Sequence, residues 1–214
     1  MFKKGHGLDK HGGMMRNNRS LGRYSLLFGS ILLFVTTLSL SGSSVGSSEE
    51  PKPPTPVKHV DLGKYVGLWY EIGKIPNRFQ RKCVGNTTAF YSLREDGRID
   101  VLNRCSIKDG GAIEAKGIAK VVDEETNARL KVSFVRFLGF SLFWGDYWIL
   151  GLDEDYKYAI VGSPGRKYGW ILSRQTSLTP DELDQVFSVL REQGYDPDDF
   201  EMTTHPSQSG IEER

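Results

Sequence analysis

The stretch GLWYEIGKIPNRFQ, residues 67–80, begins a pattern of short apolar alternations separated by turns, and the pattern continues to residue 174. Alternation with a period of two is typical of strands that bury one face. We expect eight strands, over residues 69–75, 87–94, 99–105, 112–122, 129–137, 146–152, 157–162 and 168–174. Their short connections predict an all-β, up-and-down antiparallel barrel, because closure removes the exposed sheet edges. An eight-stranded barrel has room for one small ligand.

One C-terminal α-helix is expected outside this barrel. Thr179, Pro180 and Glu182 provide the start signal, which consists of a capping residue, a proline at the first helical position and a capping box. Gly194 marks the end of the helix. The apolar residues recur at helical spacing: Leu183, Val186, Phe187 and Leu190. One face of the helix is therefore expected to pack against the barrel.

Three short motifs resemble those of the lipocalin family and occur in the same order. Gly67 and Trp69 match the G-x-W motif at the start of the family's first strand. Asp153 and Tyr156 match the motif between the sixth and seventh strands, and Arg174 matches the third motif. The resemblance covers residues 58–204. It points to the group of lipocalins that contains the bacterial lipocalins, apolipoprotein D and the plant temperature-induced lipocalins. It implies that Arg174 packs across the Trp69 indole, which is favourable by roughly 1 kcal/mol or more when desolvated.

The resemblance implies a carrier of a small lipophilic ligand, a fatty acid or lysophospholipid, that serves lipid storage, transport or repair in the cell envelope. Alternation places Trp69, Glu71 and Gly73 on one face, which must point inward if Trp69 is to meet Arg174. The residues expected to line the ligand site are Glu71, Tyr91, Phe134, Trp144, Tyr147 and Trp170. We expect Glu71 to pair with Arg174 rather than to act as a base.

The histidines argue against catalysis on this barrel. All four lie outside residues 60–204, the segment that carries the expected strands and helix: His6, His11, His59 and His205. A Ser-His-Asp triad, a zinc site with His ligands and a haem with a proximal His all need an imidazole inside the fold. We therefore expect no catalytic residue, metal or cofactor, and the net charge of +1 does not favour nucleic acid. The alternatives are a lipocalin-fold enzyme acting on a lipid or carotenoid, and a structural envelope protein that transports nothing.

Cys83 and Cys105 are expected to face an oxidising compartment and to form a disulfide. The register of the expected hairpin at Asp96-Gly97 places Cys105 opposite about residue 88, so the bond requires the chain at Gly85 to fold back over the open end. Such a bond would pin the preceding loop as a partial lid. The alternative is a pair of buried thiols.

The loops at the open end combine cationic and apolar residues. Their cations favour anionic head groups and a membrane surface, unless they are ordinary solvated charges: Arg78, Arg81, Lys82, Lys108, Arg166 and Lys167. Residues 137–144 are too apolar for an ordinary connection and predict a lid, a membrane-touching lip or a homodimer contact. The alternative is a plug folded into the top of the barrel.

The N-terminal segment is typical of an export signal. A basic stretch precedes the apolar residues 26–40, so residues 1–41 are expected to be a signal peptide or an uncleaved signal anchor. We expect export to the periplasm or cell envelope, without a lipobox cysteine. Residues 42–58 are expected to form a Ser/Gly/Pro linker, 59–204 the lipocalin domain and 205–214 a disordered tail.

Overall fold

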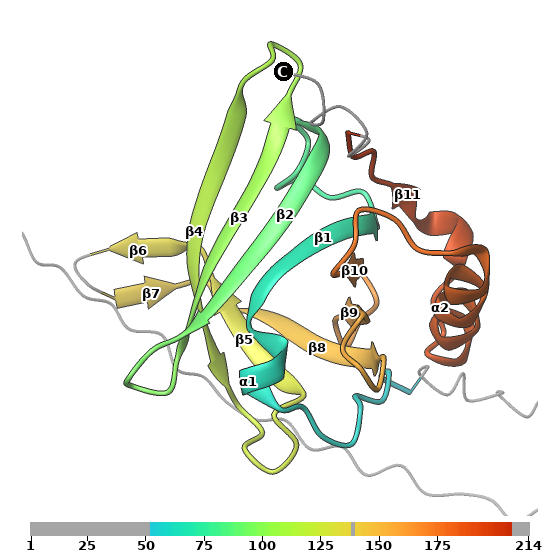
Figure 1. Cartoon of the computed structure of the whole chain (residues 1–214). Helices are drawn as coiled ribbons and strands as arrows, with labels where there is room; N and C mark the ends of the chain where they lie inside the picture. Colours follow the sequence, from blue (N-terminus) through green and yellow to red (C-terminus); the bar gives the residue numbers. More distant parts are fainter. Residues whose placement is uncertain (1–51, 138–139, 207–214) are drawn as a thin grey trace, which may run out of the picture. The chain divides into compact units, whose positions relative to one another are not determined.

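The computed structural model describes residues 52–137 and 140–206, and its main feature is a closed antiparallel barrel (Figure 1). The barrel strands are β1 (Gly67–Lys74), β2 (Cys83–Leu93), β3 (Ile99–Ile107), β4 (Ala112–Val121), β5 (Arg129–Ser133), β8 (Gly145–Leu152), β9 (Tyr158–Gly162) and β10 (Gly169–Ser173). Each strand pairs with the next, and β10 pairs with β1 to close the ring. The predicted eight-stranded barrel is therefore confirmed. The expected export signal and the tail beyond residue 206 lie outside the described residues.

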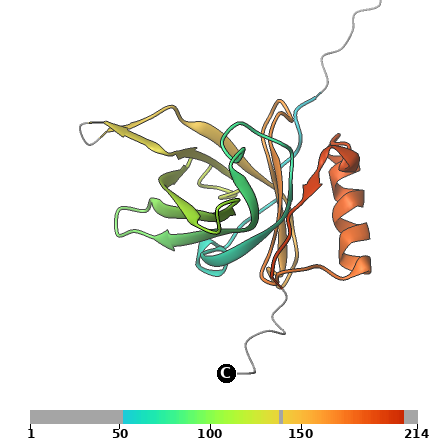
Figure 2. The same cartoon turned by 90° about the horizontal axis from the view of Figure 1, so that it is seen from above.

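The fifth expected strand, residues 129–137, is interrupted. β5 ends at Ser133, whose hydroxyl lies within hydrogen-bonding distance of the carbonyl oxygens of Leu142 at 2.5 Å and Val135 at 3.2 Å. The chain then forms a separate hairpin of β6 (Val135–Phe137) and β7 (Phe140–Leu142), which projects away from the barrel on the side opposite the helix (Figure 2). Of the expected apolar segment 137–144, residues 137 and 140–142 thus belong to this hairpin.

The helix α2 (Pro180–Glu192) packs outside the barrel, as predicted (Figure 2). Thr179 and Glu182 form the expected capping box. Val186 and Leu190 are fully buried in a hydrophobic cluster that includes Ile160 of β9. This cluster lies between the helix and the outer face of the sheet, and it is separate from the interior cluster around the Trp69 indole.

The C-terminal segment completes the barrel wall. η1 (Pro197–Asp199) and β11 (Glu201–Met202) follow α2, and β11 pairs with the end of β1. The Thr203 N–H donates to the Ile72 carbonyl, and the Asn86 N–H donates to the Thr204 carbonyl. Residues 201–204 therefore lie between β1 and β2, where those two strands diverge.

A β-bulge in β1 changes which residues face the interior. Glu71 pairs with Leu172, but Gly73 pairs with Ile171, so Ile72 is an extra residue in the strand. Leu172 belongs to the interior cluster and Ile171 to the cluster under α2. The prediction that Gly73 shares the inner face with Glu71 is therefore wrong, because the bulge turns Gly73 outward.

Cys83 and Cys105 form the predicted disulfide, with their Cα atoms 5.5 Å apart. The predicted route to it is wrong, because the chain does not fold back at Gly85. β2 instead begins at Cys83, and register irregularities on both sides of Gly85 bring Cys83 opposite Ile107. A Cβ on Gly85 would lie 2.7 Å from the carbonyl oxygen of Thr204, so only glycine fits beside the C-terminal segment.

The segment before β1 packs against the barrel, although residues up to 58 were predicted to be linker. The Val57 N–H donates to the Ile149 carbonyl, and the Val60 N–H donates to the Thr126 carbonyl. The short helix α1 (Leu62–Tyr65) follows and is capped by Asp61. In the ranges 52–137 and 140–206, no helix is long and apolar enough to cross a membrane.

The closed end of the barrel is organised by Arg174. Its guanidinium carbon lies 3.8 Å from the ring centroid of Trp69, which is fully buried. Its NH groups donate to four carbonyl oxygens of the α1–β1 segment: Lys64, Tyr65, Val66 and Leu68. Gly67 has φ of 100°, and a Cβ there would lie 3.4 Å from the guanidinium.

The remaining motif residues, Asp153 and Tyr156, shape the turn between β8 and β9. The Asp153 carboxylate accepts the N–H groups of Asp155 and Lys157, both at 3.0 Å. The Tyr156 hydroxyl accepts the N–H of Asp61 at 2.9 Å. The turn is thereby tied to the entry of α1.

Replacing Arg174 with lysine is expected to destabilise the protein by about 2–4 kcal/mol. Lysine cannot stack on the indole or reach several carbonyls at once, so partly buried acceptors lose their donors. Chemical denaturation followed by tryptophan fluorescence measures the change. Arg98→Lys, in the exposed β2–β3 turn, is the control and should remain within about 0.5 kcal/mol of the wild type. Equal stability of R174K and the wild type would contradict the role given to Arg174.

Candidate ligand-binding site

Three tyrosines from different elements meet inside the barrel. The hydroxyl oxygen of Tyr147 lies 2.8 Å from that of Tyr65 and 3.0 Å from that of Tyr91. The Tyr65 ring also packs against Trp69, with their centroids 5.1 Å apart. Two hydrogen bonds join three hydroxyls, so one O–H group has no acceptor within this cluster, whichever way the others point.

Burial raises the pKa of all three phenols. The pKa of Tyr91 is raised to about 12, and those of Tyr65 and Tyr147 lie well above their ordinary value, because the interior disfavours a phenolate. The cluster therefore consists of neutral hydroxyls at physiological pH. It can hydrogen-bond an oxygen atom but does not provide a base.

Small side chains line the wall beside the tyrosines. One row of inward-facing residues across β2, β3 and β4 consists of Ala89, Asn103 and Ala115. The Asn103 Oδ1 is buried and has no hydrogen-bond partner within the described residues. Ala115 is exposed although it faces inward. Ile113, two residues nearer to the open end on the same side of β4, is also exposed. The interior is therefore open to solvent along the upper part of β4.

Glu71 joins two segments at the open end. This residue is only 3% exposed, and it accepts the side chains of Gln80 at 2.5 Å and Thr203 at 2.7 Å. Its predicted pairing with Arg174 is wrong, because that guanidinium is engaged by carbonyls at the closed end. The His205 imidazole lies 2.8 Å from the Glu71 carbonyl oxygen, so this histidine belongs to the folded part and not to the expected tail.

Gln80 holds the β1–β2 loop, residues 75–82, at the mouth of the barrel. Its Oε1 accepts the indole N–H of Trp170 at 3.0 Å and the amide of Asn77 at 2.8 Å. The disulfide at Cys83 anchors the end of the same loop. The loop is therefore tethered to the inner wall by a side chain and to β3 by a covalent bond.

Most of the predicted lining residues lie on the inner side of the wall: Glu71, Tyr91, Phe134, Tyr147 and Trp170. The Phe134 ring stands 2.7 Å from the position that a Cβ of Gly117 would occupy on this wall. Trp144 lies elsewhere, since the Nζ of Lys120 is 4.7 Å from the centroid of its ring. Lys120 follows the inward-facing Ala119, so it points outward and the structure does not bring Trp144 to the inner set.

Sequence reasoning missed three polar members of this interior. Tyr65 precedes the first expected strand, and Gln80 lies in a loop, so no alternation pointed to either of them. Asn103 could have been found, because it alternates with the buried Val101 on β3. Its inward position follows from the register of the hairpin that joins β2 and β3.

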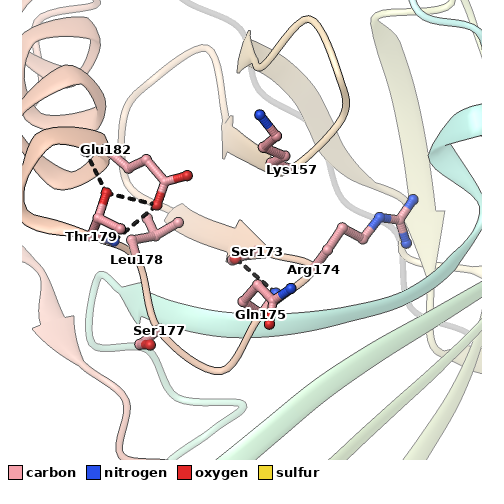
Figure 3. Close-up of a pocket in the computed structure, with 8 residues that line it drawn as sticks. All are labelled: Lys157, Ser173, Arg174, Gln175, Ser177, Leu178, Thr179 and Glu182. Atoms are coloured by element: carbon pink, nitrogen blue, oxygen red, sulfur yellow. Dashed lines mark hydrogen bonds between the residues drawn. The ribbon is translucent and has the colours of Figure 1, made fainter.

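A separate pocket of about 620 Å³ lies outside the barrel, near the N-terminus of α2 (Figure 3). It is lined by Lys157, Ser173, Arg174, Gln175, Ser177, Leu178, Thr179 and Glu182. Its polar groups largely bond one another, because Thr179 and Glu182 form the capping box and Ser173 accepts the Gln175 N–H. We therefore place the candidate site in the barrel interior and not in this crevice.

Comparisons with known proteins agree with this architecture. The protein-family model described as a Lipocalin-like domain matches residues 60–205 of this chain. Temperature-induced lipocalin-1 of Arabidopsis thaliana is 40% identical over 150 residues, covering 69% of this chain and 80% of its own. Outer membrane lipoprotein Blc of Escherichia coli (strain K12) is 34% identical over 179 residues, covering 82% and 98%. Insecticyanin from the tobacco hornworm Manduca sexta has the same fold, with a TM-score of 0.59, 21% identity and coverage of 73% and 86%.

Alkaline pH is expected to destabilise the protein from about pH 10 upward. Tyr91 keeps its proton in the folded state up to a pKa of about 12, whereas the unfolded chain releases it near 10. This stabilising difference is complete below pH 10 and is lost toward pH 12, by about 1.4 kcal/mol per pH unit. Tyrosinate absorbance against pH should therefore show several late-titrating groups, and Tyr91→Phe should remove one of them. Simultaneous ionisation of all tyrosines near pH 10 in folded protein would contradict the buried cluster.

Proposed function

Because this chain belongs to the lipocalin family, whose members bind small hydrophobic ligands, we propose that it carries a fatty acid or lysophospholipid in its barrel. The observation that carries the proposal is the inner wall of β2–β4. Its small inward-facing residues, Ala89 and Ala115, run from the buried interior to a solvent-open mouth. An apolar cavity with few polar groups suits an acyl chain.

The affinity for such a ligand comes mainly from its chain. Each buried CH₂ group contributes about 0.8 kcal/mol, so chain length raises affinity with little demand on shape. The Asn103 amide oxygen and the tyrosine O–H without an acceptor supply an acceptor and a donor along the wall. They suit a hydroxyl or ester oxygen of the ligand, or a water molecule beside it.

We propose that this carriage takes place in the cell envelope. The Escherichia coli relative is named an outer membrane lipoprotein, and the Cys83–Cys105 disulfide fits an oxidising compartment. Export would depend on the basic and apolar residues 1–41. Lipocalins are generally binding and transport proteins, so no reaction is assigned to the barrel.

Filling the wall is expected to abolish ligand binding. Ala115→Trp introduces an indole into the mouth at an exposed, inward-facing position, so it should fold and yet lose affinity for a fluorescent fatty acid by at least about 10-fold. Lys116→Trp is the matched control, because the next residue of β4 points outward. Titration of both variants and the wild type measures the difference. Unchanged affinity in A115W would rule out binding inside the barrel.

We also propose that the β6–β7 hairpin touches a membrane during ligand transfer. Phe140 and Phe143 are 73% and 83% exposed, so the expected plug inside the barrel is not what these side chains form. Val135 and Leu142 add further exposed apolar surface on the hairpin. Exposed apolar groups of this extent usually mark an interaction site.

The double variant Phe140→Ser/Phe143→Ser is expected to reduce binding to anionic lipid vesicles by about 10-fold, because two large apolar side chains no longer enter the bilayer. Vesicle co-sedimentation measures it. Phe90→Ser, on the outer wall of β2 and away from the hairpin, is the control. If the double variant bound vesicles normally but dissociated a dimer in sedimentation analysis, the hairpin would be a contact between copies instead.

A further inference from the structure

The β-bulge in β1 turns a lysine into the mouth of the barrel. Lys74 lies opposite Trp170, whose indole packs against the interior cluster, so the Lys74 side chain points inward. Only 14% of this side chain is exposed. Without the extra residue Ile72, strand alternation would have placed Lys74 on the outer face.

The Lys74 ammonium has no hydrogen-bonded partner within the described residues. Its Nζ lies 3.9 Å from Glu71 Oε1 and 3.7 Å from Glu201 Oε2, and both distances exceed that of a hydrogen bond. The Glu71 carboxylate is already engaged by Gln80 and Thr203. The Glu201 side chain is 65% exposed, so water can replace its contact with the ammonium.

Other cations near the open end are placed differently. Arg166 donates to the carbonyl oxygens of Gln193 and Lys52, so it stabilises the C-terminal end of α2. Arg78 and Lys82 are exposed on the β1–β2 loop. Lys74 alone among these cations comes from the inner face of a barrel strand and keeps its N–H donors available.

We propose that Lys74 binds the anionic head group of the ligand, a carboxylate or a phosphate, and thereby selects anionic single-chain lipids over neutral ones. This inference rests on the proposed function. The head group lies in the mouth beneath the loop 75–82, and the acyl chain extends along the wall past Ala89. Hydrogen bonds from an ammonium to an anion are shorter than neutral ones and roughly twice as strong.

The test compares three ligands of equal chain length: a fatty acid, an alkyl phosphate and a fatty alcohol. The wild-type protein should bind the two anions roughly 10-fold more tightly than the alcohol. Lys74→Met keeps the apolar stem, so it should lose this preference while binding the alcohol as the wild type does. Lys74→Arg should retain the preference, and Lys116→Met, at an outward-facing position of β4, should leave all three affinities unchanged. The thermal midpoint of each variant verifies that it is folded.

The outcomes separate this inference from the function on which it rests. Loss of affinity for one anion alone supports the role of Lys74 and identifies the head-group chemistry. Equal affinity of the wild type for acid, phosphate and alcohol, or an unchanged preference in K74M, overturns the role of Lys74 and leaves lipid carriage intact. Failure of the wild type to bind any of the three ligands overturns the proposed function itself.

Discussion

The stacking of the Arg174 guanidinium on the Trp69 indole determines where the last barrel strand meets the first. The same guanidinium donates to carbonyl oxygens from α1 to the start of β1, across a separation of 106 to 110 residues. At this closed end of the barrel, the Tyr65 ring packs against the Trp69 indole, and the Tyr65 hydroxyl reaches the Tyr147 hydroxyl. The polar character of the interior therefore depends on a contact at the closed end.

The features that sequence could predict are those with a local signal. Strand alternation located the eight barrel strands, and the capping box at Thr179 located the helix. The bulge at Ile72 could not be predicted, because an extra apolar residue between two buried positions does not visibly interrupt the alternation of apolar and polar residues. The interruption after Ser133 depends on a side-chain bond to the far arm of a hairpin, and the partners of Glu71 depend on a loop and a distant strand. These are tertiary effects that no local pattern contains.

Glu71 connects two segments at the mouth that are not barrel strands: the β1–β2 loop and the C-terminal segment. Its carboxylate accepts Gln80 from the β1–β2 loop and Thr203 from the C-terminal segment, so each of these is held against the wall. A buried carboxylate with two donors is costly to disturb, because removal of a donor leaves charge in a dry environment. The open end is thus more ordered than a ring of solvated loops, and the bulge that follows Glu71 places Lys74 beside it.

The slot between β1 and β2 is filled by residues 201–204, which hydrogen-bond to both strands. This contact joins the beginning of the barrel to almost the last described residue. During translation, β1 and β2 therefore leave the ribosome long before residues 201–204, and the wall stays incomplete until those residues have been made. A topology dominated by such long-range contacts also folds slowly.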